Sequence, residues 1–248
     1  MVIPAPVNRI VVADPAALAV TAAERLMARI EANTDRVAIC LTGGSSPKQL
    51  YRLLASEDWS KRIPWNRVHW FIGDERFVSA DDPLNNMGMA RGIFLDRFAP
   101  KGHIHPILTA VATPDESARL YEGELQSFYG AKDLDPARPL FDLALMGVGP
   151  DGHTASIFPD YPAVNETKRW VVGVPKAHVE PFVPRVTLTL PVLASCHEML
   201  FEVAGAEKHA ILERLSKDES LPANRARSLR ETVFLVDQAA TGGKSLER

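Results

Sequence analysis

Short apolar runs alternate with amphipathic stretches along most of this chain. Runs with the length and composition of strands lie at residues 9–13, 36–42, 67–72, 141–146, 170–174, 185–190, 198–203 and 232–236. Apolar residues at helical spacing predict helices at residues 14–31, 47–56, 85–98, 115–128 and 206–215. Strands that alternate with helices are typical of a parallel sheet. We therefore predict an α/β fold with a central, mostly parallel sheet flanked by helices.

The pattern also bears on domain organisation. Residues 132–139 are polar and contain two prolines, and we interpret them as a loop rather than a linker. Without an internal repeat or low-complexity tract, residues 1–248 are predicted to form a single domain. Residues 160–185 are rich in proline and mixed in polarity, which predicts a lid or a loop that crosses a site. The last residues, 241–248, are expected to be frayed.

Composition excludes several classes of protein. The chain has 248 residues, is 46% hydrophobic and carries a net charge of −3, so no basic field favours nucleic acid or anionic membranes. No apolar run approaches the roughly 18 residues of a membrane helix, and we find no signal peptide. Two cysteines, Cys40 and Cys196, form no disulfide framework, and Cys40 is expected to be buried and inert. These features predict a soluble, cytoplasmic protein.

The most informative segment is FDLALMGVGPDGHTASIFP, residues 141–159. An apolar strand runs into a glycine-rich turn, which places polar side chains at the carboxyl edge of a sheet, where α/β proteins bind ligands. His153 is suited to act as a base near neutral pH, and Asp151 can orient it. Glycines such as Gly149 allow close backbone approach to a ligand. The simpler alternative is a tight loop without function.

A second turn, TGGSSP at residues 42–47, lies between a strand and a helix. Backbone N–H groups and the positive end of the helix attract a phosphate or carboxylate there. The predicted ligands are Gly43, Gly44, Ser45, Ser46 and, in the first helical turn, Lys48. The spacing is neither that of a Walker loop nor GxGxxG, which argues against a nucleotide. A glycine turn with a serine cap is the alternative.

Several further residues are candidates for ligand contact. The segment GDER follows the third strand and supplies Asp74 and Arg76, of which Arg76 suits bidentate phosphate binding. Asn85 and Asn86, a little further on, can cap the next helix or bind sugar hydroxyls, and Asn86 is the one that we assign to the ligand. Arg185 and Lys208 complete the set of cations, although each alone, like the GDER run, can be an ordinary solvated charge.

Metal and hydrolase motifs are not evident in the sequence. The seven histidines lack metal-ligand spacing, and the closest pair, His103 and His105, is interpreted as structural. No serine lies in a GxSxG elbow. We therefore expect no metal and no cofactor.

Five segments together resemble the 6-phosphogluconolactonase family. They are LTGGSSPKQLY (41–51), FIGDERFV (71–78), LMGVGPDGHTASIFP (145–159), PRVTLTLPVL (184–193) and FEVAGAEKHAIL (201–212), in the family's order. The resemblance implies a Rossmann-like fold shared with glucosamine-6-phosphate deaminases. It also implies cofactor-independent hydrolysis of 6-phospho-D-glucono-1,5-lactone in the pentose phosphate pathway. Small departures are Ser79, where the family often has Pro, and Asn85, where it often has Ser.

The chemistry of the residues agrees with this resemblance. His153 is the expected general base on water, and cations or backbone N–H groups of residues 147–152 are expected to stabilise the tetrahedral intermediate. The phosphate is expected at the start of the helix that opens at Pro47, with Arg76 nearby. Which cation contacts the phosphate and which the lactone carbonyl stays open. The expected partner is this small molecule alone, with the protein a monomer or small homo-oligomer.

Two rival functions are less favoured. An isomerase or deaminase of the related fold typically reads DGHIAFNEP, with a glutamate five residues after the histidine, and here that position is Phe158. A sugar-phosphate sensor of the kind found in regulators would need a DNA-binding module, and the sequence shows neither a helix-turn-helix nor a basic tail.

Overall fold

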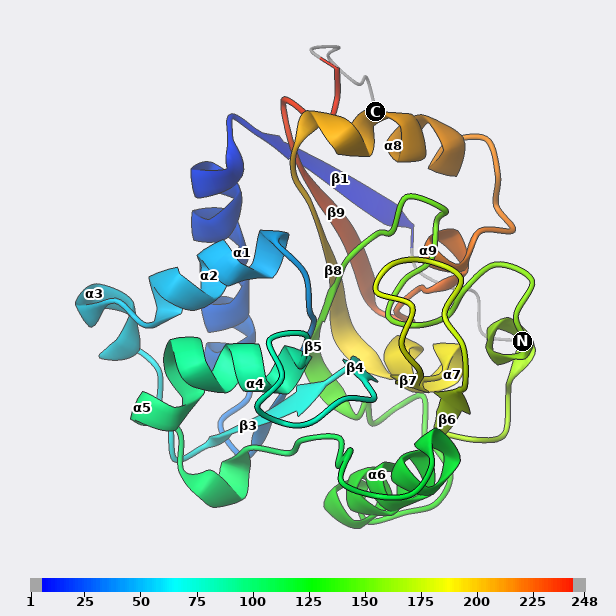
Figure 1. Ribbon diagram of the computed structural model, residues 1–248. Helices are drawn as coiled ribbons and strands as arrows, with labels where there is room; N and C mark the ends of the chain where they lie inside the picture. Colours follow the sequence, from blue (N-terminus) through cyan, green and yellow to red (C-terminus); the bar gives the residue numbers. More distant parts are fainter. Residues whose placement is uncertain (1–5, 243–248) are drawn as a thin grey trace.

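The computed structural model describes residues 6–242 and is built around a six-stranded parallel sheet (Figure 1). The strand order is β1-β9-β8-β5-β2-β3. The strands are β1 (Val7–Val12), β2 (Val37–Leu41), β3 (Val68–Ile72), β5 (Phe141–Met146), β8 (Cys196–Val203) and β9 (Glu231–Asp237). Residues of β2 and β5 are buried throughout, as expected for strands covered on both faces. The predicted α/β class is confirmed.

Helices begin largely where the sequence predicts them. Asp14 caps α1 (Pro15–Ala32) by accepting a hydrogen bond from the N–H of Ala17 at 2.8 Å. The predicted helix at 85–98 consists of three consecutive pieces, α4 (Asn86–Ala90), the π-helical η1 (Arg91–Leu95) and α5 (Asp96–Phe98). The other helices are α2 (Ser46–Leu54), α3 (Glu57–Ser60), α6 (Pro114–Tyr129), α7 (Leu190–Ala194), α8 (His209–Leu215) and α9 (Pro222–Arg225), with short 3₁₀ turns η2 (Lys101–His103), η3 (Pro162–Asn165) and η4 (Ala206–Lys208).

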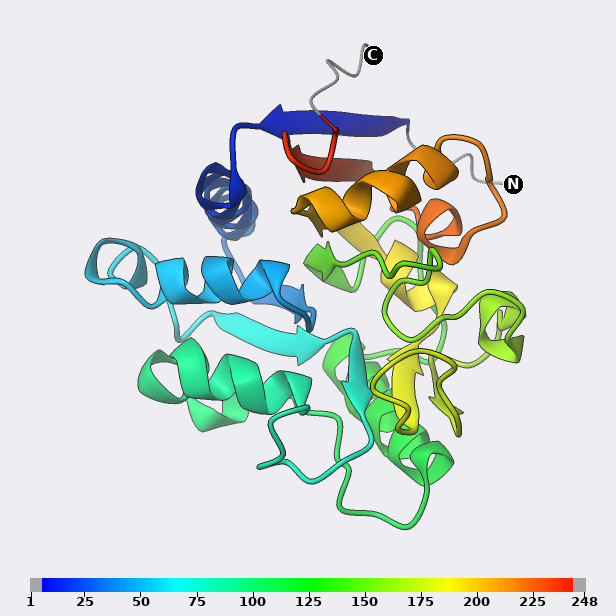
Figure 2. The ribbon, with the colours of Figure 1, turned by 45° about the horizontal axis from the view of Figure 1, so that its top comes forward.

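The connections divide the helices between the two faces of the sheet (Figures 1 and 2). The chain passes from β1 to β2 and from β2 to β3 in one direction across the sheet, and from β5 to β8 and β9 in the other. Because parallel crossovers are right-handed, α1 and α2 lie on one face, and α8 lies on the opposite face. The direction changes between β2 and β5, and a crevice opens at such a switch point, outside the carboxyl ends of the strands.

A second, three-stranded antiparallel sheet corrects the expected arrangement of the strands. It has the order β4-β7-β6, with β4 (Asp74–Arg76), β6 (Val171–Val174) and β7 (Arg185–Leu188). The sequence predicts the last two as strands but does not separate them from the main sheet, and it indicates residues 74–76 only as a charged segment after the third strand. Residues 175–184 are too few for a parallel crossover, which needs about a dozen residues or more, so β6 and β7 pair antiparallel.

A continuous apolar core unites these elements. It extends from Leu18 in α1 to Ala240 after β9 and includes the fully buried Trp70, Phe71 and Phe141. Cys40 is completely buried, as predicted. No helix within residues 6–242 combines the length and apolar character needed to cross a membrane.

Candidate active site

A pocket of about 220 Å³ lies at the switch point between β2 and β5. Eleven of the thirteen predicted site residues line it: Gly43, Gly44, Ser45, Ser46, Asp74, Arg76, Asn86, Gly149, His153, Arg185 and Lys208. Parallel strands end at the same edge of the sheet, and this brings segments distant in sequence together. The pocket is lined in addition by Thr42, Pro47, Gly147, Val148 and Pro150, which belong to the two predicted turns, and by four residues that the sequence did not indicate individually: Ala155, Val179, Glu180 and Glu202.

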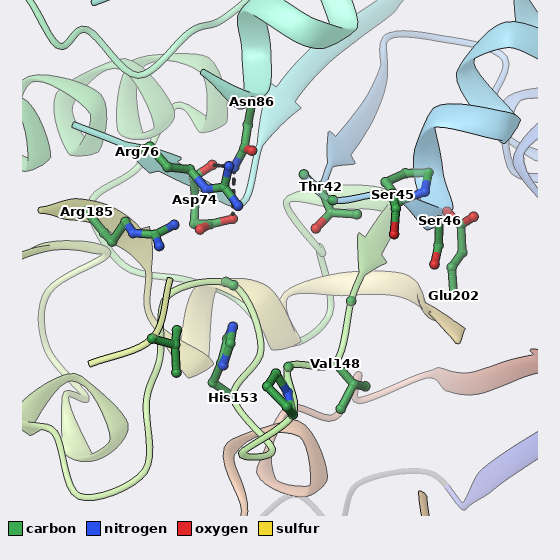
Figure 3. Close-up of a pocket in the computed structure, with 18 of the residues that line it drawn as sticks. Thr42, Ser45, Ser46, Asp74, Arg76, Asn86, Val148, His153, Arg185 and Glu202 are labelled. Atoms are coloured by element: carbon green, nitrogen blue, oxygen red, sulfur yellow. Dashed lines mark hydrogen bonds between the residues drawn. The ribbon is translucent and has the colours of Figure 1, made fainter. Parts of the chain in front are cut away.

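His153 is held by Asp151, as the sequence predicts. Nδ1 of His153 lies 2.5 Å from Oδ1 of Asp151, which also accepts the backbone N–H of His153 at 3.1 Å. Asp151 itself does not line the pocket; it stands behind the imidazole. This contact favours the tautomer with the proton on Nδ1, which leaves Nε2 as an acceptor. Figure 3 shows the ring of His153 directed into the pocket.

A second histidine, His178, holds the other oxygen of Asp151. Its Nε2 lies 2.8 Å from Oδ2 of Asp151, and its ring packs against Phe158, which also contacts the ring of His153. Burial opposes ionisation of Asp151, but the hydrogen bonds from the two histidines hold the pKa of its carboxyl well below the ordinary value. Asp151 is therefore a carboxylate at neutral pH.

Gly149 determines how closely the turn approaches the imidazole. A Cβ atom at this position would lie 2.0 Å from Cε1 of His153, which no side chain can tolerate. The N–H of Gly149 donates to the carbonyl of His153 at 2.9 Å, and the N–H of Gly152 donates to the carbonyl of Gly149 at 3.0 Å. These two N–H groups are thus engaged within the turn, so they are poor candidates for the oxyanion donors that the sequence suggested.

The GGSS turn leads from β2 into the first turn of α2. The hydroxyl of Tyr51 donates to the carbonyl of Thr42 at 2.7 Å and accepts its N–H at 3.1 Å, which fixes the start of the turn. Ser45 occupies the N-cap without a side-chain capping bond. The first N–H groups of a helix have no partner within the helix. Because Pro47 has no N–H, the backbone groups that an anion can meet here are those of Ser46 and Lys48. Gly43 is also required, because a Cβ there would lie 2.0 Å from Oδ1 of Asn86.

Two arginines lie across the pocket from Ser45 and Ser46 (Figure 3). Arg185 is only 3% exposed, and its guanidinium donates to the carbonyls of Val183 and Pro181. Burial, together with the nearby charge of Arg76, lowers the pKa of Arg185. Arg76 and Arg185 are opposite residues on β4 and β7, and two neighbouring guanidinium groups favour a negative charge or a polarised carbonyl between them.

The carboxylates beside these arginines are committed to hydrogen bonds. Asp74 accepts the hydroxyl of Ser156 at 2.6 Å. The carboxyl of Glu75, beneath the pocket, accepts the backbone N–H groups of Arg76, Asn86 and Met87 at 2.6–2.9 Å. Glu75 therefore joins β4 to the start of α4 and positions both Arg76 and Asn86.

The two predicted lysines have different places. Nζ of Lys208 donates to the carbonyl of Val148 at 2.7 Å, and burial lowers its pKa. Its ammonium group therefore lies next to the start of the glycine-rich turn, at Val148. Lys48 is exposed on α2 and is not among the residues that line the pocket.

Sequence reasoning missed two residues for which signals exist. His178 belongs to the proline-rich segment predicted to cross a site, and its neighbours Val179 and Glu180 do line the pocket. Glu202 is an acidic residue within the apolar run of β8, and such a polar residue in a buried strand indicates a special environment.

The histidines judged structural lie away from the pocket. Nδ1 of His69 lies 2.9 Å from Nε2 of His105, and the ring of His69 stacks on His103 with centroids 4.0 Å apart. Among residues 6–242, no group of three or more His, Cys, Asp or Glu side chains is arranged to hold a metal ion.

Comparison with known proteins identifies relatives. A family model described as glucosamine-6-phosphate isomerases/6-phosphogluconolactonase matches residues 13–235. A 6-phosphogluconolactonase of Synechocystis is 40% identical over 209 residues, 82% of each chain, and one of Mycobacterium leprae is 38% identical over 229 residues, 88% of this chain and 91% of the relative. The solved structure of the Thermotoga maritima 6-phosphogluconolactonase is 30% identical with a TM-score of 0.80, covering 94% of this chain and all of that one. A monomeric glucosamine-6-phosphate deaminase, 17% identical with a TM-score of 0.80 over 96% of this chain and 100% of that one, shares the fold.

Proposed function

The chain belongs to the family of glucosamine-6-phosphate isomerases and 6-phosphogluconolactonases, and we propose that it hydrolyses 6-phospho-D-glucono-1,5-lactone to 6-phosphogluconate. The observation that carries the proposal is the imidazole of His153, directed into a pocket lined with cations and fixed from behind by Asp151. A lactone of this kind needs a base for water, a donor for the carbonyl oxygen and an anion site. The pocket supplies all three.

His153 is the general base in this reaction. With its proton on Nδ1 held by Asp151, Nε2 accepts a proton from water as the water oxygen attacks C1 of the lactone. The tetrahedral intermediate collapses when the bond from C1 to the ring oxygen breaks, and the imidazolium returns its proton to that oxygen. The negative charge of Asp151 stabilises the imidazolium between these two steps.

One end of the pocket binds the phosphate of the substrate, and the other end binds its lactone group. Ser45, Ser46 and the first N–H groups of α2 bind the phosphate, and Lys208 adds positive charge. Across the pocket, Arg76 and Arg185 face the lactone end and stabilise the developing oxyanion (Figure 3). This assignment moves Arg76 from the phosphate, where the sequence suggested it, to the carbonyl. The side chain of Lys48, which does not line the pocket, has no part in it.

Phe158 favours hydrolysis over the isomerase or deaminase activity of the family. It occupies the position of the glutamate in DGHIAFNEP, is 1% exposed and packs its ring against His153. An apolar ring there offers no second acid or base for opening a sugar ring.

The wider setting is also proposed. The continuous core supports a single domain, and a net charge of −3 gives no reason to expect a nucleic-acid partner. We further propose that the protein acts in the cytoplasm as a monomer or small homo-oligomer.

A direct assay tests the proposed activity. The lactone is generated in situ from glucose 6-phosphate, and its disappearance is followed with and without the protein. We expect loss well above the spontaneous rate. Loss at the spontaneous rate, with release of ammonia from glucosamine 6-phosphate instead, would favour the rival activity.

A further inference from the structure

Glu202, near the carboxyl end of β8, is a buried acid that has no hydrogen-bond partner within residues 6–242. Its side chain is 2% exposed, and neither carboxyl oxygen has a hydrogen-bond partner among the described residues. It nevertheless lines the pocket, and Figure 3 shows its carboxyl group at the end where Ser45 and Ser46 lie. Buried polar groups are almost always hydrogen-bonded, so this carboxyl group lacks the partner that such a position requires.

A second buried glutamate on the same strand, Glu198, is paired with arginines and serves as a comparison for Glu202. Glu198 lies four residues earlier and therefore on the same face of β8. It is equally buried, yet it accepts hydrogen bonds from both Arg25 and Arg29 of α1. Among the residues that the structure describes, two arginines pair with Glu198 and none pairs with Glu202. Glu202 therefore does not stabilise this part of the protein as an ion pair.

Within residues 6–242, no cationic side chain forms a hydrogen bond or an ion pair with Glu202. Tyr51 of α2 is the ionisable neighbour, but its hydroxyl is engaged with Thr42. Leu235 is the opposite residue on β9. Lys208, after β8, directs its ammonium to the carbonyl of Val148. Burial therefore raises the pKa of Glu202 to about 8, and the side chain is a neutral carboxylic acid at pH 7.

We propose that Glu202 is a specificity-determining residue that binds the substrate's phosphate as a neutral acid, its O–H donating a hydrogen bond to a phosphate oxygen at the N-terminus of α2. The inference rests on the proposed function, which places the phosphate there. A phosphate dianion has only acceptors to offer, so it satisfies a protonated acid and repels an ionised one. The protonated side chain thus selects for a phosphorylated ligand.

The proposal predicts a linkage between binding and protonation. Above the pKa of Glu202, the carboxylate must take up a proton before the phosphate binds, so affinity falls by up to about tenfold per pH unit. The phosphate itself titrates near pH 6 and is a dianion throughout this range. Lys208 is present in the wild type and in every variant of Glu202, so the comparison between these proteins isolates the contribution of Glu202.

The test measures binding of 6-phosphogluconate by calorimetry between pH 7 and 9.5. Glu202→Gln keeps a hydrogen-bond donor but cannot ionise, and Glu202→Leu removes the donor. We expect the wild-type dissociation constant to rise more steeply with pH than that of Glu202→Gln. In buffers of different ionisation enthalpy, the wild type at pH 9 should take up close to one more proton than Glu202→Gln. Glu202→Leu should bind at least about tenfold more weakly at pH 7, and gluconate, without phosphate, should bind all three proteins alike.

Equal pH dependence and equal proton uptake in wild type and Glu202→Gln would overturn the role of Glu202, even if the protein hydrolyses the lactone. If Glu202→Leu does not fold, the comparison with Glu202→Gln decides alone. Failure of the wild type both to accelerate lactone hydrolysis and to bind 6-phosphogluconate would contradict the proposed function, and this inference with it.

Discussion

Lys208 and Arg76, two cationic residues of the pocket, have different surroundings. We assign Lys208 to the phosphate and Arg76 to the lactone carbonyl. Lys208 lies beside the glycine-rich turn with one backbone partner, Val148. Arg76 is anchored by a bond from Nη1 to the carbonyl of Leu84 at 2.9 Å, while its buried Nε has no partner among the described residues. A cation that binds phosphate contributes equally to ground and transition states, whereas one at the carbonyl contributes mainly to the transition state.

Paired substitutions therefore separate the two ends of the pocket. Lys208→Met should raise KM by about tenfold or more with kcat little changed, because uniform binding is lost. Arg76→Ala should instead lower kcat, by roughly 10²-fold, because an oxyanion donor is lost. Steady-state kinetics on both variants check the assignment. The reverse pattern would return Arg76 to the phosphate, as the sequence first suggested.

Local sequence predicts single site residues well when their partners are near in the chain. Asp151 and His153 are two positions apart, and both can be identified from one turn. His178 reaches the same carboxylate from 27 residues away, and the environment of Glu202 depends on α2 and β9. Contacts of this kind arise only when the chain folds, so the sequence does not reveal them.

At the scale of elements, the junction of β2 and α2 depends on Gly43. This glycine lies against the side chain of Asn86, which donates a hydrogen bond to the carbonyl of Asp74 at 3.0 Å. Any side chain at 43 would displace Asn86 and thereby disturb both the phosphate turn and β4.

Gly43→Ala should therefore lower kcat/KM by at least about tenfold, since displacements near 1 Å can cost 10²-fold. Gly123→Ala is the matched control, because a Cβ at that position in α6 meets nothing within 4 Å and alanine favours a helix. The control should retain wild-type kinetics. Equal kinetics in the two variants would show that Asn86 adapts without consequence.

The elements themselves are largely predictable, whereas their grouping is not. Hydrophobic periodicity marks the strands and the long helices, but it carries no information about pairing partners. The small sheet shows this, because β4 has three residues and pairs with β7 more than a hundred residues later. Its existence follows from the length of the connection between β6 and β7 and from the tertiary fold.

On the scale of the whole molecule, the parallel topology brings the site together. The change of direction between β2 and β5 gathers turns that are distant in sequence at one edge of the sheet. The alternation of strands and helices predicts this edge, and the matched segments predict the family. The number of domains and the oligomeric state stay predictions.

The assembled site predicts metal-independent catalysis. Asp74 and Glu75 are committed to hydrogen bonds with Ser156 and with backbone N–H groups, rather than converging on a common point. In the proposed mechanism, His153 and the cationic side chains of the protein carry out every step of hydrolysis. Exhaustive treatment with EDTA should therefore leave lactonase activity unchanged. Activity that disappears and returns with a divalent cation would show that side chains of the site bind a catalytic metal ion.

The central claim is that the imidazole of His153 activates water, and the kcat of His153→Ala tests it most directly. Lactone hydrolysis by wild type and variant is measured against the spontaneous rate, with the melting temperature as a check on folding. We predict a fall in kcat of roughly 10²–10⁴-fold with little change in melting temperature. A folded variant that retains nearly full activity above the spontaneous rate would contradict the mechanism.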